Sequence, residues 1–190
     1  MRIKGHATFT AILIVSGLNE LGERDILAIE AYPDESKESY LKLFNSLKER
    51  GLDCPRLIVS DGAVGLTTAM AEVLPEAKWQ HCKVHLIRKI LRNVRVEDRQ
   101  TLGDELKEIW YTSSKKEALR RANKIYKKYN DKYPKAMIRL KYGIHDTLTF
   151  LDFPDILLKK SQPQTCLNDS IRNFVDVASL LEFSRTFRHA

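Results

Sequence analysis

The sequence predicts an α/β fold in which a mixed sheet is joined to a basic, all-helical block. Residues 8–16 and 25–32 are apolar stretches rich in strand-forming side chains, and a loop bounded by Gly17 and Gly22 separates them like a hairpin. Helical and strand-like spacing of apolar residues then alternates through residue 81. From residue 83 the spacing is helical only. These observations predict a sheet with a hairpin at one edge and crossover helices after it.

Each later element of the first half has its own local signal. In residues 36–50 the apolar side chains recur with helical spacing, and Gly51 follows as a stop. Residues 56–60 are continuously apolar, which is typical of a strand covered on both faces. Residues 66–74 predict a second helix, and residues 77–81 a last short strand.

The second half predicts helices that are rich in Lys, Arg, Leu and Ala. We expect a domain division into a core, a basic helical insertion and a final core helix within residues 167–183 that is incomplete. The expected domain ranges are 1–85, 86–160 and 161–190, and the expected helices of the insertion are residues 84–94, 99–111, 115–129 and 134–141.

The net charge of +7 is concentrated in the middle of the chain. Residues 1–85 carry 10 Lys/Arg and 12 Asp/Glu, whereas residues 86–160 carry 19 and 10, and residues 161–190 carry 3 and 3. Concentrated positive charge is typical of a protein that binds a polyanion such as nucleic acid. The alternative is a solvated, lysine-rich helical surface of the kind common in soluble proteins.

Composition predicts a soluble, cytoplasmic protein. No apolar stretch approaches the roughly 18 residues that a membrane span needs, and the first residues lack the apolar segment of a signal peptide. Three widely spaced cysteines, an odd number, do not indicate a disulfide framework. We therefore expect no membrane partner.

Asp61 is the first candidate site residue. It follows the apolar strand and precedes a helix, where α/β sheets place their chemistry, and Gly62 permits a sharp exit from the strand. One interpretation is a helix N-cap, because a carboxylate accepts N–H bonds from the first turn. The other is a ligand of a divalent metal ion, since carboxylate oxygens suit Mg²⁺.

Cys82 and His85 form a Cys-x-x-His pair at the next strand-to-helix junction. Zinc prefers four ligands, and no second pair stands at a suitable spacing, so we expect no zinc site. A buried cysteine and a hydrogen-bonded histidine is the favoured interpretation. The histidine is alternatively placed to approach a phosphate.

A basic run follows directly, with near-helical spacing. Cationic side chains along one helix are suited to gripping a nucleic-acid backbone, and we expect this role for the run. The aromatic residues that follow fit packing between helices as well as base stacking. The run consists of Arg88, Lys89, Arg92 and Arg95.

Three segments together resemble the Mutator-type insertion-sequence transposases. They are "LKERGL" (47–52), "LIVSDGAVGL" (57–66) and "LPEAKWQHCKVHLIRKIL" (74–91). That family's pattern has Asp-Gly-x-x-Gly-Leu after a strand, then Pro-x-Ala, then Cys-x-x-His followed by Arg-Asn, where this chain has Arg-Lys. The matching positions are Asp61, Gly62, Gly65, Leu66, Pro75, Ala77, Gln80, Cys82 and His85.

The resemblance implies a DNA transposase core with a ribonuclease-H-like mixed sheet and an all-helical basic insertion. In that family two Asp residues and one Glu hold two divalent ions, Mg²⁺ or Mn²⁺, roughly 4 Å apart for in-line transfer of a DNA phosphodiester. Asp61 matches the second acid. The partners implied are transposon ends and target DNA, together with self-association or a full-length transposase.

The other two acids of the family pattern are not matched. The first lies on a strand just before a segment like "RIKG", which here begins at Arg2. The third is a glutamate, and Thr165 stands at its place; Asp169 and Glu182 are the candidate replacements. We therefore expect a core truncated at both ends and catalytically inactive, because a single carboxylate cannot hold two metal ions close together.

Two other functions remain open on the sequence. One is a non-catalytic DNA-binding module or regulator derived from a transposase, retained for its basic helices. The other is an unrelated α/β hydrolase or phosphotransferase with Asp61 as base or nucleophile and His81 as its local partner.

Overall fold

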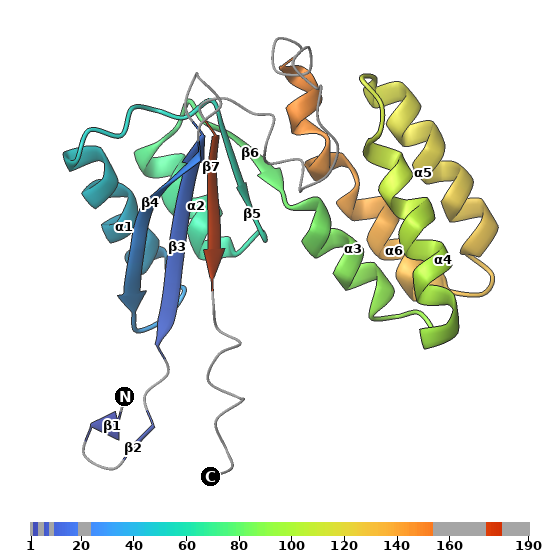
Figure 1. Cartoon of the computed structure of the whole chain (residues 1–190), viewed down its shortest axis with the longest axis horizontal. Coiled ribbons are helices and arrows are strands. Elements are labelled where there is room, and N and C mark those ends of the chain that lie inside the picture. The colour runs from blue at the N-terminus through green and yellow to red at the C-terminus, as the bar shows by residue number, and fades with distance from the viewer. Residues whose placement is uncertain (1, 4–5, 8–9, 19–23, 154–173, 180–190) are drawn as a thin grey trace. The chain divides into compact units, whose positions relative to one another are not determined.

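A computed structural model of the chain describes residues 2–3, 6–7, 10–18, 24–153 and 174–179. The chain divides into two compact units. The first comprises Met1–Lys78 and Arg172–Ala190, and the second comprises Trp79–Ile171. Figure 1 labels the helices and strands of both, and each unit is described by itself below.

The first unit contains strands β3, β4, β5 and β7 of a mixed sheet with the strand order β4-β3-β7-β5-β6; the edge strand β6 begins at Lys78, the last residue of this segment of the first unit. β3 pairs antiparallel with both β4 and β7, and β7 pairs parallel with β5, so β4 and β5 run in the same direction. The predicted hairpin is the β3–β4 pair. A separate antiparallel pair, β1 and β2, precedes it. The strands are β1 (Arg2–Ile3), β2 (His6–Ala7), β3 (Ala11–Leu18), β4 (Arg24–Tyr32), β5 (Leu57–Ser60), β6 (Lys78–His81) and β7 (Phe174–Ser179).

Two helices, the amphipathic α1 (Lys37–Glu49) and the more apolar α2 (Val64–Val73), pack against each other and lie on the same side of the sheet in Figure 1. α1 begins at Ser36, whose hydroxyl accepts the Ser39 N–H at 3.3 Å. Burying one large apolar side chain fully contributes about 1.5–3 kcal/mol. The fully buried side chains of this unit include Leu13, Leu43, Phe44, Leu57, Ile58 and Leu66.

The prediction of a final core helix within residues 167–183 is wrong for the part of that range that the structure describes. Residues 174–179 form β7, which lies between β3 and β5. Val175 and Val177 are β-branched and favour extended backbone. Pairing on both edges, with β3 and with β5, satisfies the strand's backbone groups and outweighs the helical spacing of the surrounding apolar residues.

The second unit is helical from Lys83 through Asp152, apart from its turns, as the sequence predicts. Its core includes the fully buried side chains of Ile90, Trp110, Leu140 and Phe150. Two buried polar contacts cross this core. The Trp110 indole N–H donates to Thr147 Oγ1 at 3.1 Å, and the Phe150 N–H donates to Gln80 Oε1 at 2.8 Å. The helices are α3 (Lys83–Leu91), α4 (Val96–Lys107), η1 (Glu108–Trp110), α5 (Lys115–Tyr129), α6 (Pro134–Gly143), η2 (His145–Thr147) and η3 (Thr149–Asp152).

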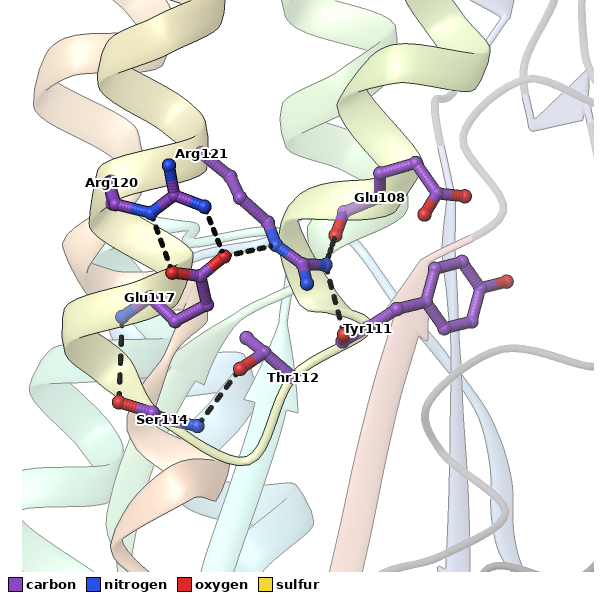
Figure 2. Close-up of polar contacts among 7 residues, drawn as sticks. All are labelled: Glu108, Tyr111, Thr112, Ser114, Glu117, Arg120 and Arg121. Carbon is purple, nitrogen blue, oxygen red and sulfur yellow. Dashed lines mark hydrogen bonds and ion pairs between the residues drawn. The ribbon is translucent and has the colours of Figure 1, made fainter.

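A polar cluster holds the start of α5 against the end of η1 (Figure 2). Ser114 Oγ accepts the Glu117 N–H at 3.4 Å and caps α5. The Glu117 carboxylate accepts from the guanidinium groups of Arg120, at 2.7 Å, and Arg121, at 2.9 Å. Arg121 also donates to the carbonyl oxygens of Glu108 and Tyr111. Hydrogen bonds from the two arginines lower the pKa of Glu117 to about 2.

None of the helices in the described part of the chain combines the length and the apolar character that a membrane span requires.

Candidate functional site

Asp61 lies in the first unit, on the turn that connects β5 to α2. Gly62 adopts a φ of 85°, a backbone conformation that side chains with a Cβ disfavour, so the chain leaves the strand sharply as the sequence predicts. Asp61 Oδ1 accepts the Ala63 N–H at 3.1 Å and thereby closes this turn. The N-cap of α2 is Ala63 and its side chain makes no capping bond, so the interpretation of Asp61 as the N-cap residue is wrong.

The environment of Asp61 includes a buried tyrosine and a second acid. Tyr40, on α1, is only 2% exposed. Burial, and then the negative charges of Glu35 and Asp61, raise the pKa of its hydroxyl. An anionic phenolate is disfavoured there because it would be poorly solvated and would face two carboxylates. The Tyr40 hydroxyl is therefore a neutral group near both acids.

Gly65, in the first turn of α2, packs directly on the segment that leads into α1. A β-carbon at this position would lie 2.7 Å from the carbonyl oxygen of Glu35 and 2.8 Å from the Lys37 nitrogen. These contacts are with backbone atoms, which cannot rotate away as a side chain can. The glycine therefore has a packing role next to the Asp61 turn.

Cys82 and His85 lie in the second unit, at the junction of β6 and α3, as the sequence predicts. Cys82 is the N-cap residue of α3 and is half-buried, and His85 stands in the first turn and is also half-buried. The preceding residue, His81, ends β6, and its Nε2 lies 3.3 Å from Nζ of Lys89. This distance fits a hydrogen bond that the lysine ammonium donates to His81 Nε2.

The four basic residues expected to bind DNA differ in their surroundings. Arg88 and Arg92 are exposed, four positions apart, and therefore share one face, although α3 ends at Leu91 and Arg92 is its C-cap. Arg95 is exposed but is the extended N-cap of α4, where a weak ion pair of 3.8 Å links it to Glu97. The single helix expected to carry all four thus ends before Arg95. Lys89 is half-buried beside His81.

The described residues include no group of three or more His, Cys, Asp or Glu side chains placed to hold a metal ion. Thr165, Asp169 and Glu182, which bear on the third acid expected from the resemblance, lie outside the described residues. Carboxylate oxygens suit Mg²⁺ and Mn²⁺, and Mg²⁺ is commonly held by one or two carboxylates with water completing the shell.

The protein thus combines an α/β unit, which has an acid at the carboxyl end of a strand, with a basic helical unit. The family model for "Transposase, Mutator family" matches residues 1–181. The chain belongs to the Mutator family of transposases.

Several curated relatives are transposases of bacterial insertion sequences. The chain is 33% identical to the transposase of IS1201 from Lactobacillus helveticus over 165 residues. This aligned segment covers 87% of this chain and 44% of that protein. It is 32% identical over 175 residues to the transposase of ISRM5 from Rhizobium meliloti, covering 90% and 44%. It is 29% identical over 184 residues to the transposase of IS406 from Burkholderia multivorans, covering 95% and 47%. The chain spans less than half the length of these relatives.

Sequence reasoning did not single out Glu35 or the packing role of Gly65. A signal for Glu35 was present, because it follows a predicted strand closely, as Asp61 does. Recognising it required the relative direction of β4 and β5, which depends on pairing with β3 and β7.

Proposed function

We propose that this chain is a portion of a transposase catalytic core of the kind that acts on DNA by metal-dependent phosphoryl transfer. We propose also that the chain itself is inactive, because Asp61 is the only one of the three metal-binding acids that its sequence matches. Membership of the Mutator family and the position of Asp61 at the carboxyl end of β5 support this proposal. Asp61 is the proposed ligand of Mg²⁺ or Mn²⁺, which would neutralise the developing charge on a phosphodiester. A ribonuclease-H-like sheet is part of the same proposal, supported by the hairpin at one edge and the parallel β7–β5 pair.

The second unit supplies the proposed contacts to the DNA backbone. Arg88 and Arg92 are exposed, and no ion pair joins either one to a carboxylate among the described residues. By contrast, other cations of this unit are already neutralised by neighbours, as Lys107 is by Asp104 and Lys128 by Glu105. An unneutralised arginine releases more counterions when it meets a phosphate, so the exposed arginines favour DNA.

The test is the salt dependence of duplex DNA binding, measured by fluorescence anisotropy between about 50 and 200 mM salt. Each phosphate contact contributes about 0.9 to the slope of log K against log salt, so replacing Arg88 and Arg92 by alanine should reduce the slope by up to about 2. The matched control replaces Lys107 and Lys128, which removes the same charge from ion-paired positions. An equal reduction in both variants, or no salt-dependent binding by the unaltered chain, contradicts the proposal.

A further inference from the structure

One side of α6 in the second unit combines exposed cations with exposed apolar side chains. These residues recur at positions i, i+3, i+4 and i+7 of the helix and therefore share one face. The opposite side of α6 includes the buried Met137 and Leu140 and packs against α3 and α5. We call the exposed side the outer face of α6. It consists of Lys135, Ile138, Arg139 and Tyr142.

The two apolar side chains of the outer face are unusually open to solvent. Tyr142 is 73% exposed and Ile138 is 50% exposed, and they stand four positions apart. Among the described residues no aromatic ring packs on Tyr142, and Lys141 Nζ lies 5.8 Å from the centre of its ring, near the outer limit of a cation–π contact. A single exposed apolar side chain is ordinary, but a tyrosine and an isoleucine flanked by cations form a surface suited to a partner.

The charge of the outer face indicates what kind of partner it fits. The helix contains no Asp or Glu, and no ion pair joins Lys135, Arg139 or Lys141 to a carboxylate among the described residues. The nearest acids along the chain, Asp131 and Asp146, lie beyond the two ends of α6. Pairing this face with the same face of a second copy would bring like charges together, whereas a polyanion complements it.

The outer face belongs to a helix that adjoins α3. In Figure 1 the two helices are neighbours in the second unit. A β-carbon on Gly143 would lie 2.5 Å from a methyl group of Leu86, so the end of α6 that carries Tyr142 lies beside the first half of α3. Axes of packed helices are about 8–10 Å apart. The cations of α6 and the exposed Arg88 of α3 are therefore carried by adjacent helices.

We propose that the outer face of α6 binds an unpaired segment of DNA, with one base stacked on the ring of Tyr142. Lys135 and Arg139 contact the backbone phosphates, and Ile138 packs beside the stacked base. In a duplex the face of each base is already covered by its neighbours, so an exposed ring stacks on a base only where the DNA is unpaired. The inference rests on the proposed function and adds the kind of DNA that the second unit takes.

The experiment compares binding of a fluorescent single strand of about 12 nucleotides and of the matching duplex to the full chain, by fluorescence anisotropy in EDTA. Tyr142→Ala should weaken binding of the single strand about five- to 150-fold, which is the usual effect of removing a stacking ring. Tyr142→Phe keeps the ring and should bind within about twofold of the unaltered chain. Tyr111→Ala is the matched control, because Tyr111 is another exposed tyrosine of this unit, and should bind the single strand normally.

A strand with the same phosphates but without bases separates stacking from charge. On this abasic strand Tyr142→Ala should bind like the unaltered chain, because no base is present to stack. Replacing Lys135 and Arg139 together by alanine should lower the salt slope on both strands by up to about 1.4. Tyr142→Ala should also keep the melting temperature of the unaltered chain, because the side chain is exposed.

Two outcomes overturn the inference. One is equal affinity of Tyr142→Ala and Tyr142→Phe for the single strand. The other is a dimer, detected by sedimentation velocity, that Tyr142→Ala abolishes without changing single-strand binding, which would assign the outer face to a second copy of the chain.

Failure of this inference is distinguishable from failure of the proposed function. Duplex binding through Arg88 and Arg92, with no effect of Tyr142→Ala on the single strand, contradicts the α6 site alone. Absence of salt-dependent binding to both the duplex and the single strand contradicts the proposed function itself.

Discussion

Gly65 packs so closely on Glu35 that a β-carbon at Gly65 would lie 2.7 Å from the Glu35 carbonyl oxygen. The start of α2, which follows the Asp61 turn, is therefore positioned by backbone-to-backbone contact with the segment that begins α1. This contact links the geometry of the candidate site to the packing of the two helices.

We predict that Gly65→Ala destabilises the protein. The added methyl group meets backbone atoms that can move only if α1 and α2 separate, which costs roughly 1–3 kcal/mol in a well-packed region. Urea denaturation followed by circular dichroism measures the change. The control is Gly103→Ala in α4, where the nearest atom is a leucine methyl at 3.4 Å. That substitution should be neutral or stabilising by up to about 1 kcal/mol, because alanine favours a helix.

A second prediction concerns the buried contact between Trp110 and Thr147. Thr147→Val removes the hydroxyl that accepts the indole N–H, and an unsatisfied buried donor costs about 1–3 kcal/mol. Thr101→Val, at an exposed position of α4, should change stability by about 0.5 kcal/mol or less. Combining Thr147→Val with Trp110→Phe should cost less than the sum of the two single changes, since the donor and its acceptor are then both absent. Strict additivity would contradict a specific hydrogen bond.

The third prediction concerns the effect of low pH on the polar cluster at the start of α5. The pKa of Glu117 is about 2 in the folded protein, against an ordinary value of 4.5, so folding favours its ionised form. The stability this contributes is fully present above pH 4.5 and is lost as the pH falls toward 2. Glu117→Gln should therefore lower the melting temperature at neutral pH, and the difference from the unaltered chain should shrink between pH 4.5 and 2.

The comparison for this prediction is Glu76→Gln, a change at an exposed acid after α2. It should show no comparable pH-dependent difference. A constant difference between Glu117→Gln and the unaltered chain from pH 7 to pH 2 would show that the carboxylate's charge does not stabilise the cluster.

The fourth prediction is that the 190-residue chain does not cleave transposon-end DNA. Thr165 occupies the place where the Mutator-type pattern has a glutamate, and threonine supplies no carboxylate for a second metal ion. The measurement is strand cleavage of terminal-repeat DNA with Mg²⁺ or Mn²⁺. Robust cleavage that is lost in Asp61→Ala would refute the prediction, and would show that other acids of the chain complete the site.

The sequence by itself determined the order of the main helices and strands from β3 through α6, the helical character of the second unit and the turn at Asp61, but it did not predict the short elements β1, β2, η2 and η3. These features depend on local spacing, on glycine conformation and on strand and helix preferences, all of which act between near neighbours. The positive φ of Gly62 illustrates this, because the residue type alone indicated the sharp turn.

Only the tertiary structure decided which distant segments meet. Residues 174–179 form a strand because they pair with both β3 and β5. The hydrogen bonds of this pairing outweigh the local helical spacing of the apolar residues. Glu35 lies near the Asp61 turn because β4 and β5 run together and Gly65 admits close approach. Arg95 does not share the face of α3 that carries Arg88 and Arg92, because α3 ends at Leu91 and Arg95 is the N-cap of α4. Each outcome depends on the free energy of contacts between residues far apart in the chain, which spacing along the sequence does not encode.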